Sequence, residues 1–71
     1  MSQWISTPGS SNVAGFSYDE GNQILTVEFT NGSRYDYYDI PDHKFDAIKV
    51  ADSVGKYLNA EIKGKHRYSR H

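Results

Sequence analysis

Two neighbouring tyrosines are the side chains best suited to holding a flat ligand. Tyr35 and Tyr37 are two residues apart in a stretch of strand-forming residues, so their rings share one face of a strand, while Tyr38 takes the other face. Such a pair can form a platform for a nucleic-acid base, with the hydroxyl groups reading polar atoms. The alternative interpretation is that tyrosine is a good strand residue whose ring is simply half-buried.

A second stretch, Ser53-Val54-Gly55-Lys56, is similar to the end of a phosphate-binding loop. It is not a P-loop, because the leading glycine is missing and Tyr57 stands where a Ser or Thr would bind magnesium. A capped helix start, a glycine that allows close approach and a lysine could nevertheless hold an anion. Plain helix capping by Ser53 explains the same residues.

Residues typical of catalysis or metal binding do not form a constellation in this sequence. His43, His66 and His71 do not share metal-ligand spacing with one another or with an acid on one helical face. No serine is paired with a nearby base, and the lack of cysteine excludes a disulfide or a thiolate metal site. We therefore expect a binding module rather than an enzyme, with no cofactor and no metal.

Charge is unevenly distributed along the chain. Residues 1–55 carry three basic and eight acidic side chains, a net charge of −5, whereas residues 56–71 carry five basic and one acidic, a net charge of +4. The basic end interleaves Lys63, Lys65, Arg67 and Arg70 with Tyr68, which could stack on a base. This pattern favours an anionic ligand such as RNA or a nucleotide, although a solvated, mobile tail would look the same.

Three strands are predicted to carry the tyrosines, at residues 13–18, 24–30 and 34–40. Leu25, Val27 and Phe29 alternate with polar residues and should face the core. Turn-forming residues 19–22 and the Asn31-Gly32 pair separate the strands, which predicts an antiparallel meander. We expect residues 1–11 to form an arm rather than a strand, and residues 12–71 to form one domain.

Two short helices are predicted after the strands. Pro41 suits a helix start, and Phe45, Ile48 and Ala51 then share one face. Ser53 can cap a second helix that ends at Gly64 and whose apolar stripe consists of Val54, Tyr57, Leu58 and Ile62. The predicted fold is therefore α+β, a three-stranded antiparallel meander followed by two short helices packed on one sheet face.

At this point the chain resembles the KTSC domain family, named for the C-terminus of some lysyl-tRNA synthetases and also found as small free-standing bacterial or phage proteins. The resemblance covers about residues 10–70. The matching residues are Ser10-Ser11-Asn12, Tyr35-x-Tyr37, Ile40-Pro41, Ala51-x-Ser53-x-Gly55-x-Tyr57-x-Asn59 and Ile62-Lys63-Gly64-x-x-Arg67.

The resemblance implies a binding role, for which RNA has been the suggested ligand. It carries the family's tyrosine pair onto Tyr35 and Tyr37, its serine-glycine turn onto Ser53 and Gly55, and its basic end onto Lys63 and Arg67. The full set of expected ligand-binding residues is Tyr35, Tyr37, Ser53, Gly55, Lys56, Tyr57, Asn59, Lys63 and Arg67.

We expect a non-enzymatic module for a phosphate-bearing ligand, either RNA or a small nucleotide. The acidic body favours a compact ligand over a long nucleic acid. A free-standing copy could be a phage protein that sequesters a host nucleotide immune signal. The alternative is a protein-interaction or oligomerisation module that uses the tyrosine-rich surface.

The expected setting is the cytoplasm of a bacterial or phage-infected cell. The first residues lack a signal-peptide pattern, and no stretch approaches the roughly 20 apolar residues of a membrane span. A domain of this size has a small core, so we also expect homo-oligomers.

Overall fold

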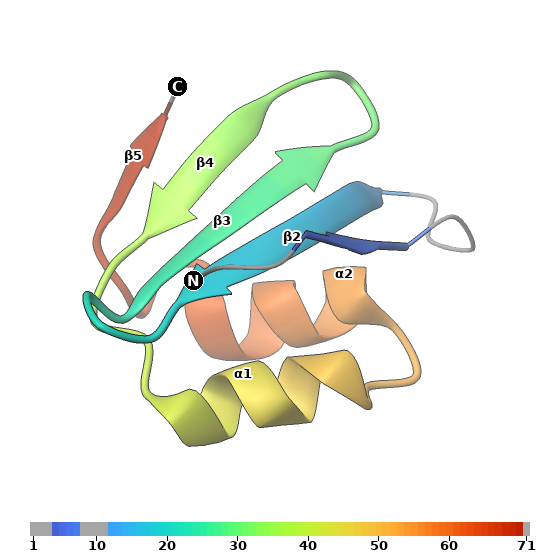
Figure 1. Cartoon of the computed structure of the whole chain (residues 1–71). Coiled ribbons are helices and arrows are strands. Elements are labelled where there is room, and N and C mark those ends of the chain that lie inside the picture. Colours follow the sequence, from blue (N-terminus) through green and yellow to red (C-terminus); the bar gives the residue numbers. More distant parts are fainter. Residues whose placement is uncertain (1–3, 8–11, 71) are drawn as a thin grey trace.

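Alternation of apolar and polar residues along the middle of the chain produces the central strands of a five-stranded antiparallel sheet. The computed structural model describes residues 4–7 and 12–70. In Figure 1 the strands lie in the order β1-β2-β3-β4-β5, and the helices cover one face. The bounds are β1 Ile5–Ser6, β2 Val13–Asp19, β3 Ile24–Phe29, β4 Arg34–Tyr37 and β5 Tyr68–Arg70.

The two tight turns of the central meander fall where the sequence predicts them. Gly32 has a φ of 90° in the β3–β4 turn, a conformation that favours glycine. In the β2–β3 turn the Asp19 carboxylate accepts hydrogen bonds from the backbone N–H groups of Gly21 and Asn22, at 3.1 and 3.3 Å. The positive φ there belongs to Gln23, at 55°, rather than to Gly21 or Asn22.

Two helical segments follow the meander. Helix α1 (Asp42–Lys49) begins after Pro41, and helix α2 (Val54–Tyr57) begins after Ser53, whose hydroxyl oxygen accepts from the Lys56 N–H at 3.3 Å. This confirms the predicted capping role of Ser53. The chain then continues as a π-helical turn, η1 (Leu58–Ile62), so the second predicted helix is in fact two joined segments. No helix in the described part of the chain is long and apolar enough to cross a membrane.

The core lies between the sheet and the helices. Leu25 and Val27 are fully buried, which confirms the predicted inward face of β3, and Phe29 packs against the same cluster from its margin. Helix residues complete the core from the other side. Its buried members are Val13, Phe16, Tyr18, Leu25, Val27, Tyr37, Ile40, Ile48, Leu58 and Ile62.

The prediction of three strands is wrong, because each edge of the sheet carries one more short strand. Ile5–Ser6 pairs with Gly15 and Phe16, so part of the expected arm is strand; residues 1–3 and 8–11 lie outside the described residues. Tyr68–Arg70 pairs with β4, so the basic end is not a free tail. Strands of two and three residues are too short to show alternation. Strand β4 also ends earlier than expected, at Tyr37, and Asp39 beyond it has a φ of 58°.

Candidate functional site

Four aromatic rings gather on the helix-facing side of β3, β4 and β5. Tyr35 and Tyr37 stack with their centroids 6.2 Å apart, which confirms that they share one face. Tyr68 lies 5.7 Å from Tyr35 and 5.9 Å from Tyr37, and Phe29 meets Tyr35 edge to face at 5.6 Å. We call these four residues the open aromatic cluster, because a pocket separates them from the second helix.

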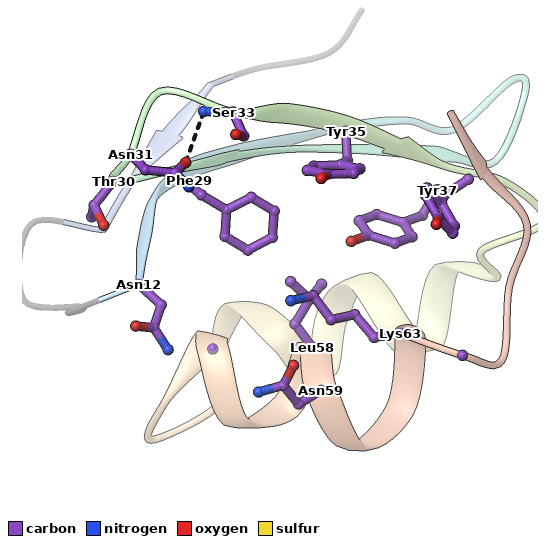
Figure 2. Close-up of a pocket in the computed structure, with 13 residues that line it drawn as sticks. Asn12, Phe29, Thr30, Asn31, Ser33, Tyr35, Tyr37, Leu58, Asn59 and Lys63 are labelled. Atoms are coloured by element: carbon purple, nitrogen blue, oxygen red, sulfur yellow. Dashed lines mark hydrogen bonds between the residues drawn. The ribbon is translucent and has the colours of Figure 1, made fainter. Parts of the chain in front are cut away.

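The pocket between this cluster and α2–η1 has a volume of about 640 Å³. In Figure 2 the rings of Phe29, Tyr35 and Tyr37 point from the sheet toward Leu58, Asn59 and Lys63 on the helical side. We call this space the tyrosine pocket. It is lined by Asn12, Phe29, Thr30, Asn31, Ser33, Tyr35, Tyr37, Gly55, Leu58, Asn59, Lys63, Gly64 and Tyr68.

Polar groups around the pocket come from three parts of the chain. The Lys63 ammonium lies 4.8 Å from the centre of the Phe29 ring, which places a positive charge beside the open aromatic cluster. Asn59 is exposed one turn earlier on η1. At the hairpin end the Asn31 side-chain oxygen accepts a hydrogen bond from the Ser33 N–H at 2.9 Å. The aromatic rings thus form an apolar floor, and hydrogen-bonding side chains and the Lys63 cation surround it.

The Tyr37 hydroxyl group stays protonated across the ordinary pH range. Burial of Tyr37, together with the neighbouring hydroxyl groups of Tyr35 and Tyr68, raises its pKa above the usual value. The Tyr37 ring is almost fully buried, at 2% exposure, whereas Tyr68 is 61% exposed. The buried ring therefore forms a fixed floor, and the exposed ring forms the rim that a ligand would meet first.

The pocket brings together five of the nine residues predicted to bind ligand, which are Tyr35, Tyr37, Gly55, Asn59 and Lys63. Gly55 is buried beneath the side chain of Asn12, and a methyl group added to it would lie 3.4 Å from the Asn12 amide nitrogen. Its small size therefore allows α2 to approach Asn12, a role in packing that the sequence interpretation did not include.

The other four predicted residues, Ser53, Lys56, Tyr57 and Arg67, are not among the residues that line the pocket. Ser53 caps α2, and Lys56 is exposed on that helix. The Arg67 guanidinium lies over the Tyr38 ring at 5.7 Å and 3.3 Å from the Asp39 carboxylate. Plain capping accounts for Ser53, and Arg67 makes its contacts beside Tyr38.

Several lining residues were not among the predicted site residues. Asn12, Thr30, Asn31 and Ser33 reach the pocket because the β3–β4 turn and the start of β2 meet at one end of the sheet. Tyr68 was expected to belong to a basic tail, where its ring could stack on a base, and not to this cluster. The pairing of Tyr68 with Tyr37 across β4 and β5 brings its ring into the cluster. No local sequence signal identifies this contact, because it joins segments about thirty residues apart.

His66 anchors the segment that leads from η1 to β5. Its Nε2 atom lies 3.0 Å from the Lys44 ammonium, which also donates to the Glu61 carbonyl at 3.0 Å. Burial and the nearby Lys44 charge lower the pKa of His66, opposed by a hydrogen bond to the backbone of Tyr38. The ring is therefore held neutral, which allows Nε2 to accept from Lys44.

The architecture defines the class of the protein: a small α+β domain with a five-stranded antiparallel sheet and helices on one face. A solved KTSC domain protein from Yersinia pestis has the same fold, with a TM-score of 0.90 at 26% identity, over 100% of this chain and 99% of that one. The family model of the KTSC domain matches residues 9–68. The chain therefore belongs to the KTSC domain family, as its motifs indicate.

Relatives of the chain are of two kinds. A protein from Tsukamurella paurometabola is 38% identical over 58 residues, which are 82% of this chain and 87% of that protein. A lysine–tRNA ligase from Nostoc punctiforme is 36% identical over 63 residues, which are 89% of this chain but only 11% of the ligase. The same domain thus occurs both in small proteins and as a minor part of a much larger enzyme.

Proposed function

We propose that the tyrosine pocket binds a nucleotide unit, either a small free nucleotide or a nucleotide of an RNA, without changing it chemically. The observation that carries this proposal is the lining itself, which combines four aromatic rings, Lys63 and no carboxylate among the lining residues that the structure describes. Aromatic rings stack on bases of any sequence, and a lysine near them attracts phosphate.

The size of the pocket supports a compact ligand. Small-molecule sites have volumes of about 300–1,000 Å³, and the tyrosine pocket, at about 640 Å³, lies within that range. None of the lining residues is acidic, although residues 1–55 as a whole carry a net charge of −5, which would repel a long polyanion. In this arrangement the rings of Tyr35 and Tyr68 would hold the base, and Lys63 would hold the phosphate.

Both kinds of relative are compatible with this proposal. Part of a lysine–tRNA ligase matches the chain, and that enzyme is named for tRNA, which supports the RNA form of the ligand. The small relatives support a domain that works without an attached enzyme. A free-standing domain that binds a nucleotide and releases it slowly could act by sequestration. In a phage, such a domain could sequester a nucleotide immune signal of the host.

The first step of the test identifies the ligand, by isothermal titration with nucleosides, nucleoside monophosphates and short RNA oligomers. The second step compares two lysines that have the same charge but lie at different positions. Lys63→Met should then weaken binding of that ligand about tenfold or more, because the phosphate loses its cation. Lys56→Met is the matched control, since Lys56 is exposed outside the pocket, and it should leave affinity within about twofold.

The outcomes separate the proposal from its competitors. Equal loss in both lysine variants would point to general charge attraction rather than to the pocket. Tighter binding of an RNA oligomer than of any mononucleotide, with a steep salt dependence, would select RNA as the ligand. Chromatography of the ligand after incubation should recover it intact, and a new product would contradict the non-enzymatic role. Failure of every nucleotide and RNA to bind would overturn the proposed function.

A further inference from the structure

Strand β5 forms one edge of the sheet and pairs only with β4 among the described residues. Its three residues, Tyr68, Ser69 and Arg70, are all exposed. An edge strand presents backbone N–H and C=O groups that can pair with another strand. The direction in which each of these groups points decides what strand would fit.

The hydrogen bonds of β4 fix those directions. In an antiparallel pair, residues alternate between a bonded and a non-bonded partner. The Phe29 N–H donates to the Ser33 carbonyl, and in that register the backbone groups of Tyr35 and Tyr37 point toward β3. Asp36 and Tyr38 therefore point toward β5, in agreement with the bond from the Tyr38 N–H to the Arg67 carbonyl at 2.9 Å.

The same alternation continues into β5. Arg67 pairs with Tyr38 and Ser69 pairs with Asp36, so the backbone groups of Ser69 point inward to β4. The N–H and C=O groups of Tyr68 and Arg70 consequently point outward, to the free edge. Tyr68 and Arg70 flank Ser69 symmetrically. A two-fold rotation about Ser69 therefore places the outward backbone groups of Tyr68 opposite those of Arg70 in a second copy of the strand.

We propose that two copies of the chain pair through antiparallel β5 strands, with Ser69 facing Ser69 and Tyr68 facing Arg70 of the second copy. Each Tyr68–Arg70 pair would exchange two backbone hydrogen bonds, which gives four across the two-fold axis. The two sheets would join into one continuous sheet. The pairing does not depend on what the tyrosine pocket binds.

The side chains are complementary in the same register. Tyr68 and Arg70 lie on the helix-facing side of β5, since Tyr68 contacts Tyr37 and the Arg70 guanidinium lies 5.9 Å from the centre of the Tyr35 ring. Pairing would therefore set Arg70 of the second copy against the exposed ring of Tyr68, a cation facing an aromatic ring. Each copy would add a positive charge at the rim of the other's tyrosine pocket. Among the three residues of β5, no like charges face each other in this register.

Single cysteines test both the pairing and its register, because the chain has no cysteine of its own. Facing Ser69 residues form a non-bonded pair with Cα atoms about 4.5 Å apart, inside the range a disulfide needs. Ser69→Cys should therefore be converted mostly to a covalent dimer of about twice 8.1 kDa under mild oxidation, as seen on a non-reducing gel. Circular dichroism confirms that the variant is folded.

Two controls make the result specific. Ser6→Cys places the thiol on the opposite edge strand, β1, at another exposed serine, and should stay monomeric. Arg70→Cys places it in β5 one residue out of register, where the two Cα atoms would be roughly 8 Å apart, and should also stay monomeric. Cross-linking of Ser69→Cys no faster than that of Ser6→Cys would overturn the proposal. Cross-linking only in a mixture of the two variants would replace it with head-to-tail pairing of β5 with β1.

Discussion

Two aromatic clusters lie on the same face of the sheet, and one is filled while the other is open. On the β2 side, Phe45 of α1 stacks on Tyr18 at 4.6 Å and meets Phe16 edge to face at 6.0 Å. We call these three residues the closed aromatic cluster. On the β4–β5 side, the open aromatic cluster meets Lys63, Asn59 and Gly64 across a pocket instead of another ring.

The difference lies in what the helices supply opposite each cluster. In the closed cluster even the tyrosine hydroxyl is used, since it lies 2.9 Å from the Asp42 carboxylate at the start of α1. In the open cluster the helical side supplies one apolar side chain, Leu58, beside small, polar or charged residues, and the Tyr68 ring remains 61% exposed. The rings on the β2 side thus all pack into the core, whereas on the β4–β5 side the Tyr68 ring remains largely exposed.

The largest expected difference between the two clusters is in stability, and truncating one ring in each cluster tests it. Phe16→Ala should lower the free energy of unfolding by about 3–5 kcal/mol, because Phe16 is 1% exposed and its loss leaves a cavity. Tyr68→Ala should cost far less, because most of that ring already faces solvent. Urea denaturation of both variants measures the two losses, and equal losses would show that the open cluster is as important to the fold as the closed one.

The second largest expected effect is a loss of stability at alkaline pH, which arises in the closed cluster. Burial, with the hydrogen bond to Asp42, raises the pKa of Tyr18 to about 12, whereas a tyrosine in the unfolded chain ionises near 10. The unfolded state therefore loses this proton first, and stability should fall as the pH rises from about 10 to about 12. Tyr18→Phe should flatten that part of the profile, and thermal melting across the range measures it. An unchanged slope in the variant would assign the loss to other tyrosines.

Acidic pH should have a smaller effect, on the side of the open cluster. The pKa of His66 is lowered in the folded state, so the unfolded chain takes up the proton first and stability should decline as the pH falls below about 6.5. His66→Gln, which cannot titrate, should remove the decline. Melting of both proteins between neutral and mildly acidic pH provides the comparison. A decline of the same size in the variant would exclude His66 as its source.

Much of the site could be predicted where the evidence is local. The spacing of Tyr35 and Tyr37 was sufficient to place their rings on one face, and the cap at Ser53 followed from residue type alone. The structure separates the cap from the pocket, because Ser53 and Lys56 do not line it. A helix start looks like an anion site in any sequence, and only the packing of α2 against the sheet shows which side its residues face.

The fold was predicted in its centre and missed at its edges. Strands β2, β3 and β4 have enough residues, and clear enough turns, for alternation to identify them. Strand β1 has only two residues, and β5 pairs with a strand about thirty residues earlier in the chain and has three exposed residues with no apolar face to detect. The polar and basic composition that suggested a mobile tail is equally suited to an exposed edge strand.

The order of the strands has a consequence for how the domain folds. Strands β2, β3 and β4 are joined by short turns, so their pairing closes small loops and should form early. Pairing of β5 with β4 must instead wait until the whole helical segment between Tyr37 and Tyr68 has been brought back to the sheet. We therefore expect the tyrosine pocket to be assembled late and to open early. In hydrogen exchange a bound ligand should then slow the amides that join β4 to β5 and leave those between β2 and β3 unchanged.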